Sequence, residues 1–419
     1  MTNRFIIKFR KALSVLGPGV VTGASDDDPS GIATYSQAGA GFGFSTLWMA
    51  IITFPLMASI QEMCARIGIV TQAGLTGTIK NHYPKWVVYL MLVFSFPAIT
   101  LNIGADIQGM GAVAHMLFPR IPVFAFSFMV TTLMIAVIIL YPYQKLASVL
   151  KWLCLVLLLY IIVPFLIKLN WIDVLKHTVI PTIHFNKEFI EIVVAILGTT
   201  ISPYLFFWQA TMEAEDIAHA SRKVFINKRF MNKMEVDVYT GMFLSNLVMF
   251  FVILTTGAVL YTAHIRQIDT VEQAAKALEP LAGKLTYYIF ALGIMGTGML
   301  AIPVLAGSLS YILAETLGWK GGLDLKFKNA KGFYITIIVS LILGLCMDSL
   351  GISPIKALIY TAILYGLTSP VIIAIVLHIC NNKKIMGDFT NGIGSNLLGA
   401  ITLVLMSASA VALIYFQFK

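Results

Sequence analysis

Charged residues are scarce in this sequence. Only 12% of the 419 residues are Asp, Glu, Lys or Arg, whereas 58% are hydrophobic. A soluble protein of this length carries about a quarter charged residues, so the composition argues against a soluble enzyme or binding module. It fits a chain whose apolar runs of about 20 residues cross a bilayer repeatedly. We therefore expect the lipid bilayer to surround most of the chain.

Cysteines are few and catalytic motifs are absent. The four cysteines, Cys64, Cys154, Cys346 and Cys380, form no CxxC pair and lie in apolar segments. We expect buried free thiols rather than a disulfide framework or a zinc site. The sequence has no HExxH, GxSxG or paired-aspartate protease pattern. We therefore expect neither an enzyme nor a bound cofactor.

The net charge of +9 does not indicate a nucleic-acid partner, because most of the 29 Lys and Arg residues lie in short loops between apolar segments. This bias is typical of cytoplasmic loops. We expect a multi-pass protein of the cell membrane, with no nucleic-acid partner. Its N-terminus would be cytoplasmic, without a signal peptide.

The apolar runs predict an all-α membrane protein of eleven spans, whose odd number puts the C-terminus on the extracytoplasmic side. The predicted spans are 14–41, 45–68, 86–117, 122–142, 145–168, 189–216, 237–262, 285–317, 332–350, 354–380 and 393–417. We expect loops at 169–188, 217–236, 263–284 and 318–331.

Two of these spans are interrupted. The first contains DDDPSG at 26–31, and the sixth contains GTTISPY at 198–204. Because they lie five spans apart, the halves 14–168 and 189–380 would be inverted repeats within one transporter domain, followed by an extra helix at 393–417. Broken helices at matching positions of inverted halves indicate a transporter's central site. An open backbone inside the bilayer is tolerated only where it is buried in protein or lines a cavity.

Both breaks carry hard oxygen donors. These are the Asp28 carboxylate, the Ser202 hydroxyl and the backbone carbonyls around Thr199 and Thr200. Neither break contains Cys, Met or His. Such donors favour magnesium, manganese or calcium over copper or zinc, and the ion would be the transported substrate.

The same residues resemble the Nramp family of divalent metal transporters, whose first-span motif is Asp-Pro-Gly-Asn followed by Ala-Thr and Gln-Ala-Gly-Ala. Asp28, Pro29, Ala33, Thr34 and the QAGA at 37–40 match it, and NNKKIMGDFTN at 381–391 resembles a late family segment. The resemblance implies a LeuT-like inverted-repeat bundle. It also implies that the ion is held by Asp28, by a sixth-span carbonyl at Thr199 and by the side-chain positions of Gly31 and Ser202.

Two departures bear on the ion. Gly31 stands where the family has its metal-binding Asn, and Ser202 stands where it has its metal-binding Met. Loss of a thioether removes a filter for transition metals, and a wider pocket admits a hydrated ion. The pattern is therefore similar to the Nramp-related magnesium transporters. We expect Mg²⁺ transport, also of Mn²⁺, by a monomer using alternating access.

Proton coupling is expected to be weak or absent. Tyr204 and Gln209 replace two family histidines implicated in proton movement, and neither residue type titrates near neutral pH. One alternative is a proton-coupled Mn²⁺/Fe²⁺ transporter of the Nramp type. The other is a sodium-coupled transporter of a small solute with the same architecture.

Further polar residues are expected around the ion or along its path. They are Asp27, Thr200, Tyr204, Gln209 and Asp106. For Asp27 the competing interpretation is a solvated carboxylate, and for Asp106 it is a hydrogen bond between helices. Glu62 and Arg66 are expected to pair with each other along their helix.

Overall fold

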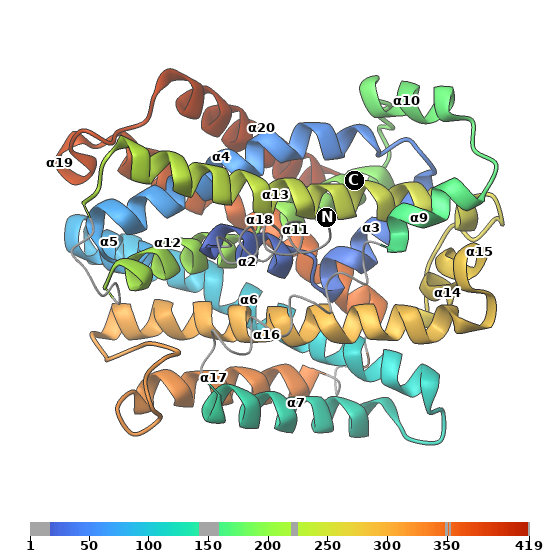
Figure 1. Ribbon diagram of the computed structural model, residues 1–419, viewed down its shortest axis with the longest axis horizontal. Helices are drawn as coiled ribbons and strands as arrows, with labels where there is room; N and C mark the ends of the chain where they lie inside the picture. Colours follow the sequence, from blue (N-terminus) through green and yellow to red (C-terminus); the bar gives the residue numbers. More distant parts are fainter. Residues whose placement is uncertain (1–16, 142–158, 219–224, 348–350, 352, 418–419) are drawn as a thin grey trace, which may run out of the picture.

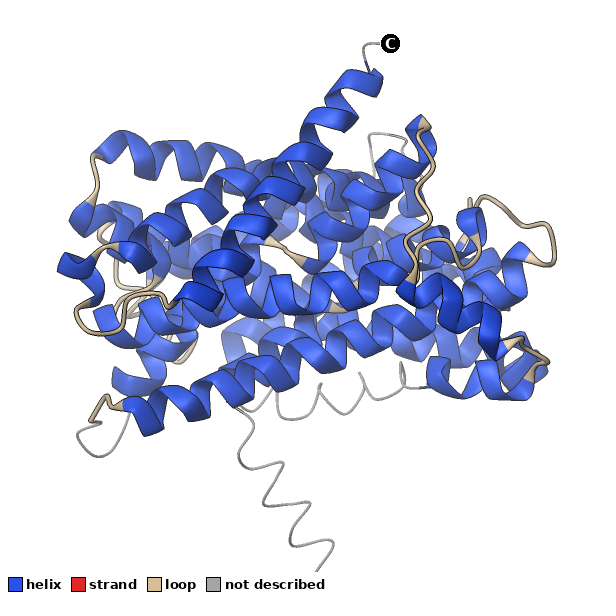
Figure 2. Ribbon diagram, turned by 90° about the horizontal axis from the view of Figure 1, so that it is seen from above, coloured by secondary structure: helices blue, strands red, loops and turns tan. Residues whose placement is uncertain are grey.

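The computed structural model describes residues 17–141, 159–218, 225–347, 351 and 353–417, and every regular element in these ranges is a helix (Figure 2). Several predicted features lie wholly or partly outside the described residues. They include the basic N-terminus with the start of the first span, the first part of the fifth span, residues 219–224 of the basic loop and the end of the ninth span. Cys154 also lies outside.

The helices follow one another with short connections (Figure 1). In chain order they are α2 (Pro18–Asp26), α3 (Pro29–Phe42), α4 (Trp48–Thr71), α5 (Leu75–His82), α6 (Lys85–Leu117), α7 (Val123–Leu140), α9 (Leu159–Leu166), α10 (Trp171–Val179), α11 (Lys187–Thr200), α12 (Pro203–Ala218), α13 (Lys228–Thr256), η2 (Gly257–Tyr261), α14 (Val271–Ala275), η3 (Lys276–Leu278), α15 (Glu279–Ala282), η4 (Gly283–Leu285), α16 (Thr286–Leu317), α17 (Lys331–Cys346), α18 (Pro354–Asn381), α19 (Lys383–Met386) and α20 (Ile393–Gln417).

Each predicted span contains helix in its described part, only the last part of the fifth span being described, and both predicted breaks are present. Eight helices among the described residues are long and apolar enough to cross a membrane. The prediction of plain loops was wrong at 169–188 and 263–284, which contain α10, α14 and α15. Local capping explains part of this difference. Thr270 and Gln273 form a reciprocal capping box at α14, and the Asn170 side chain caps α10.

The connections between the long helices lie at the two ends of the molecule, as expected for spans that cross in alternating directions. The long helices run roughly along the long axis of the molecule (Figure 1). The connections predicted to be cytoplasmic, including α5 and α19, gather at one end, and α10, α14 and α15 lie at the other. A miscounted span would have placed some of these connections at the wrong end.

The broken helices lie in the centre of the bundle, in close contact with their neighbours (Figure 1). α2 packs on α13, and α12 packs on α4. Gly23 permits the first contact, because a Cβ atom there would overlap the backbone of Gly241. Small residues at such crossings let membrane helices approach closely. Asp237 of α13 adds a polar contact, since its carboxylate accepts hydrogen bonds from the Gly17 and Gly19 amides at 2.9 and 2.7 Å.

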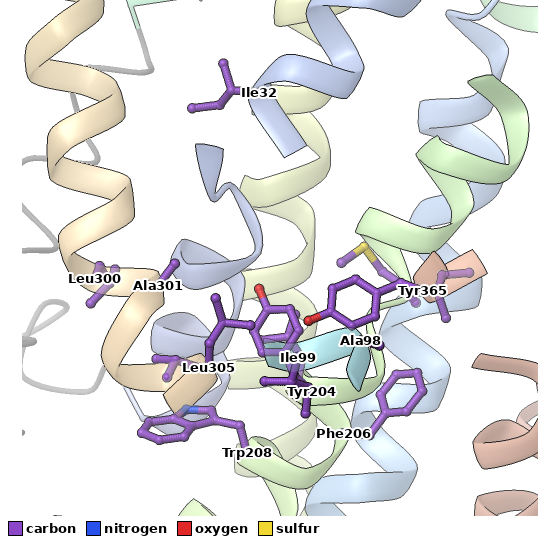
Figure 3. Close-up of a cluster of buried hydrophobic side chains, with 14 of the residues drawn as sticks. Ile32, Ala98, Ile99, Tyr204, Phe206, Trp208, Leu300, Ala301, Leu305 and Tyr365 are labelled. Atoms are coloured by element: carbon purple, nitrogen blue, oxygen red, sulfur yellow. The ribbon is translucent and has the colours of Figure 1, made fainter. Parts of the chain in front are cut away.

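A buried aromatic cluster forms one wall beside the breaks (Figure 3). The rings of Tyr204 and Tyr365 lie 5.7 Å apart, centroid to centroid, at an interplanar angle of 34°. Phe206 and Trp208 of α12 extend the cluster, and Leu305 of α16 packs into it. This wall holds the start of α12 in place and excludes water from the centre.

Candidate metal site

The first break brings a carboxylate to the start of a helix. α2 ends at Asp26, and α3 begins at Pro29, so Asp28 is the N-cap of α3. Its Oδ1 accepts a hydrogen bond from the Gly31 amide at 2.7 Å. Its Oδ2 accepts one from Asn102 Nδ2 of α6 at 2.9 Å. Two donors therefore fix the Asp28 carboxylate, and an N-terminal helix position favours its negative charge.

A proline in each break frees one backbone carbonyl. The carbonyls of Ser25 and Thr199 would bond in a helix to the amides of residues 29 and 203, which are prolines and have no N–H. The Tyr204 hydroxyl donates to the Ser25 carbonyl at 2.9 Å. The Ser202 hydroxyl donates to the Thr199 carbonyl at 2.5 Å. Both carbonyls are thus available as oxygen ligands once a hydroxyl turns away.

Gly31 lies where the two breaks meet. A Cβ atom there would be 3.2 Å from the Asp26 carbonyl oxygen and 3.2 Å from Thr199 Oγ1. A larger side chain would require the Thr199 side chain or the break itself to shift. The glycine therefore allows the first break to lie close against the second.

The whole site is closed to solvent in this conformation. Asp28, Thr199 and Ser202 are 2%, 3% and 1% exposed. No basic side chain in the described residues forms an ion pair with Asp28. A buried carboxylate without a basic partner needs a cation or a proton to offset the cost of burial. The oxygen donors around Asp28 fit a divalent metal ion.

Comparison with known proteins decides the family. The model of the family described as "Natural resistance-associated macrophage protein-like", or Nramp, matches residues 19–416. The chain belongs to the Nramp family.

Curated relatives of this Nramp chain include two proteins named divalent metal cation transporter MntH. The one from Caldanaerobacter subterraneus subsp. tengcongensis is 24% identical over 420 residues, which cover 99% of this chain and 95% of the relative. The one from Klebsiella pneumoniae subsp. pneumoniae is 26% identical over 386 residues, which cover 90% and 88%. These names do not support the predicted place in the magnesium branch.

Solved structures show the same fold. A crystal structure of the Eremococcus coleocola manganese transporter has a TM-score of 0.76 at 17% identity, covering 97% of this chain and 87% of that one. Mhp1, a nucleobase-cation-symport-1 family transporter, has a TM-score of 0.56 at 12% identity, covering 95% and 92%. The LeuT-like architecture is therefore confirmed. The repeat boundaries at 168, 189 and 380 stay a prediction.

Three predicted site residues of this Nramp chain make other contacts, and their roles stay predictions. Asp27 Oδ1 accepts a hydrogen bond from the Ser245 hydroxyl of α13 at 3.4 Å. The Thr200 hydroxyl donates to the Ile196 carbonyl within its own helix. Gln209 accepts from Thr22 at 2.5 Å and donates to Glu213 at 2.9 Å. It therefore links α2 to α12 about two turns from the break.

Some contacts have no signal in the sequence motifs. The Ser245 hydroxyl donates to Asp26 Oδ2 at 2.6 Å, which fixes the last turn of α2 against α13. Neither Ser245 nor Asp237 follows a motif, because the register of α13 against α2 comes from tertiary packing.

Two other predictions have clear outcomes. The Arg66–Glu62 pair is confirmed at 2.9 Å, and Arg66 also donates to the carbonyls of Phe389 and Thr390. These bonds attach the late family segment at 381–391 to α4. The prediction of buried thiols holds for Cys64 and Cys380 but was wrong for Cys346, which is exposed at the end of α17.

Proposed function

We propose that this chain transports divalent metal cations across the cell membrane by alternating access. The observation that carries the proposal is Asp28, a buried carboxylate at the meeting point of two broken helices. Asp28 and the Thr199 carbonyl would bind the ion directly. The Ser202 hydroxyl would contact the ion or its water molecules, whereas the close packing around Gly31 leaves no wider space at that position in this conformation.

Mn²⁺ is the first candidate substrate, as in the alternative of a Nramp-type Mn²⁺/Fe²⁺ transporter. The Eremococcus coleocola protein, named a manganese transporter, supports this assignment, and the names of the MntH relatives support a divalent metal cation. Hard oxygen donors, which dominate the site, bind Mn²⁺ well.

Mg²⁺ is a second candidate, favoured by one observation on this chain. The positions of the family's metal-binding Met and Asn hold Ser202 and Gly31. A site with only oxygen donors has no soft ligand with which to reject the more abundant Mg²⁺. We therefore propose that Mg²⁺ competes with Mn²⁺ at the same site.

The driving force would be the membrane potential. It supplies about 2.3 kcal/mol per elementary charge per 100 mV, and twice that for a divalent ion. Tyr204 and Gln209 both make hydrogen bonds that need no proton exchange. Weak or absent proton coupling therefore remains our proposal, as do a monomer and a cytoplasmic N-terminus.

Flux into proteoliposomes tests the function. Purified protein with a Mn²⁺-sensitive dye inside the vesicles should give Mn²⁺ influx that rises with an inside-negative potential. Millimolar Mg²⁺ outside should slow this influx, whereas the same concentration of a monovalent salt should not. Absence of influx would overturn the proposal. Influx unaffected by Mg²⁺ and dependent on a proton gradient would favour the proton-coupled alternative.

A further inference from the structure

The third predicted span supplies a second carboxylate next to the breaks. Asp106 lies one helical turn after Asn102, so both side chains are on the same face of α6. Asn102 contacts Asp28, and Gly109 of the same face lies against Pro29. Asp106 therefore lies on the face of α6 that packs on the start of α3.

Asp106 has no partner among the described residues that would explain its burial. It is 0% exposed, and neither of its carboxylate oxygens has a hydrogen-bond donor in that part of the chain. The Ser30 amide acts on Asp106 electrostatically, but it lies outside hydrogen-bonding geometry. Asn102 Oδ1 likewise has no donor from any residue that the structure describes. Native proteins rarely leave such buried acceptors unpaired, because the cost is large.

The same aromatic wall faces both carboxylates. Tyr204 and Tyr365 each interact electrostatically with Asp28 and with Asp106. Asp28 and Asp106 also interact with each other. The two like charges thus converge on one buried region, where no described basic side chain forms an ion pair with either.

We propose that Asp106 is a second carboxylate ligand of the transported ion, which is held between α3 and α6. The inference rests on the proposed function and adds a second negatively charged ligand. Gly31 has no side chain and Ser202 has a neutral hydroxyl, so neither can supply that charge. Two carboxylates would balance the charge of one divalent ion, which disfavours monovalent ions at the site. Asn102 is then a positioning residue, because its amide orients Asp28 toward this ion.

A change of ligand softness tests direct coordination. Asp106→Cys places a thiol at the proposed ligand position, and a thiolate binds Cd²⁺ better than Mn²⁺. We expect Cd²⁺ to produce a thiolate charge-transfer absorption in the near ultraviolet that the parent lacks. A residue that acts only through another residue would not produce this band. Ile107→Cys is the matched control, because residue 107 is buried but lies neither three nor four residues from Asn102, Asp106 or Gly109, and so on a different face of α6.

Asp106→Asn provides a second readout that needs no thiol. The purified variant should bind Mn²⁺ more than about a hundredfold more weakly than the parent, which exceeds the roughly 10–100-fold loss caused by removal of an indirect partner of a metal ligand. If the cysteine variant fails to give a monodisperse protein, this affinity decides. A loss of about a hundredfold or less in Asp106→Asn would overturn the inference.

Asp28→Cys separates this inference from the proposed function. A Cd²⁺–thiolate band in Asp28→Cys without one in Asp106→Cys would overturn the role of Asp106 and leave the Asp28 site intact. Bands in both variants would support a site with two carboxylates. Absence of Mn²⁺ binding by the parent would instead count against the proposed function.

Discussion

At the scale of single residues, we expect the residue at position 202 to set the ion selectivity of the proposed site. The Ser202 hydroxyl donates to the Thr199 carbonyl at 2.5 Å. This carbonyl, which we propose as a ligand of the ion, is therefore already hydrogen-bonded. Binding of an ion would require this hydroxyl to turn. A thioether at this position would leave the carbonyl free and add a soft donor.

Ser202→Met is therefore expected to raise the preference for Cd²⁺ and Mn²⁺ over Mg²⁺ by about tenfold, equivalent to about 1.4 kcal/mol. Competition of each ion against Mn²⁺ influx in proteoliposomes measures the change. Ser202→Ala is the matched control, because it frees the carbonyl without adding sulfur. An equal shift in both variants would show that the sulfur has no part in selectivity.

Residue patterns predicted part of the site. Asp28, Pro29 and Pro203 are recognisable because a carboxylate and two helix breakers are costly inside apolar sequence unless they line a cavity or a buried site. The bond from Tyr204 to Ser25 joins residues 179 positions apart, and no local pattern encodes such a distance. The hydrogen bond between Thr22 and Gln209 likewise joins distant residues, and the place of Gln209 along the ion path stays a prediction.

At the scale of elements, α2 depends on α13 for its N-terminal cap. Gly17 has no side chain that could cap α2, and the carboxylate of Asp237 accepts from the Gly17 and Gly19 amides instead. A cap supplied by another helix stabilises α2 only while the two helices are in contact. Movement of α2 away from α13 must break these bonds.

We expect Asp237→Ala to destabilise α2 by about 0.5–2 kcal/mol, as loss of a helix cap does elsewhere. Thermal unfolding of the purified variant should occur at a lower temperature, and a cysteine at Thr22 should react faster with maleimide. Thr240→Ala is the control, because Thr240 is exposed on α13 and, among the described residues, its hydroxyl bonds only to the Val236 carbonyl of its own helix. Equal stability and reactivity in parent and variant would contradict the capping role.

At the scale of the whole molecule, successive connections between the long helices lie at opposite ends. Connections at the same end are expected to share one side of the membrane. α19 lies at one end of the molecule, and η3 lies next to α14 and α15 at the other (Figure 1). Apolar runs and basic loops predict the parity of the spans, and which side is cytoplasmic stays a prediction. The way α6 and α16 pack against each other was not, because such contacts depend on side-chain shape.

Surface labelling tests the orientation. A cysteine replacing Lys276 in η3 should react with an impermeant maleimide on intact cells, because this exposed position is predicted to be extracytoplasmic. A cysteine replacing Lys383 in α19, also exposed, should react only after permeabilisation. The reverse pattern would invert the orientation without changing the fold.

The most direct test of the central claim is Mn²⁺ influx into proteoliposomes containing the parent, Asp28→Asn or Asp388→Asn. Asp388 is an exposed aspartate after α19 and serves as the control for loss of one carboxylate. If the ion is held at the meeting point of the two breaks, Asp28→Asn abolishes influx and Asp388→Asn transports like the parent. Influx through Asp28→Asn at the parent's rate would contradict the account.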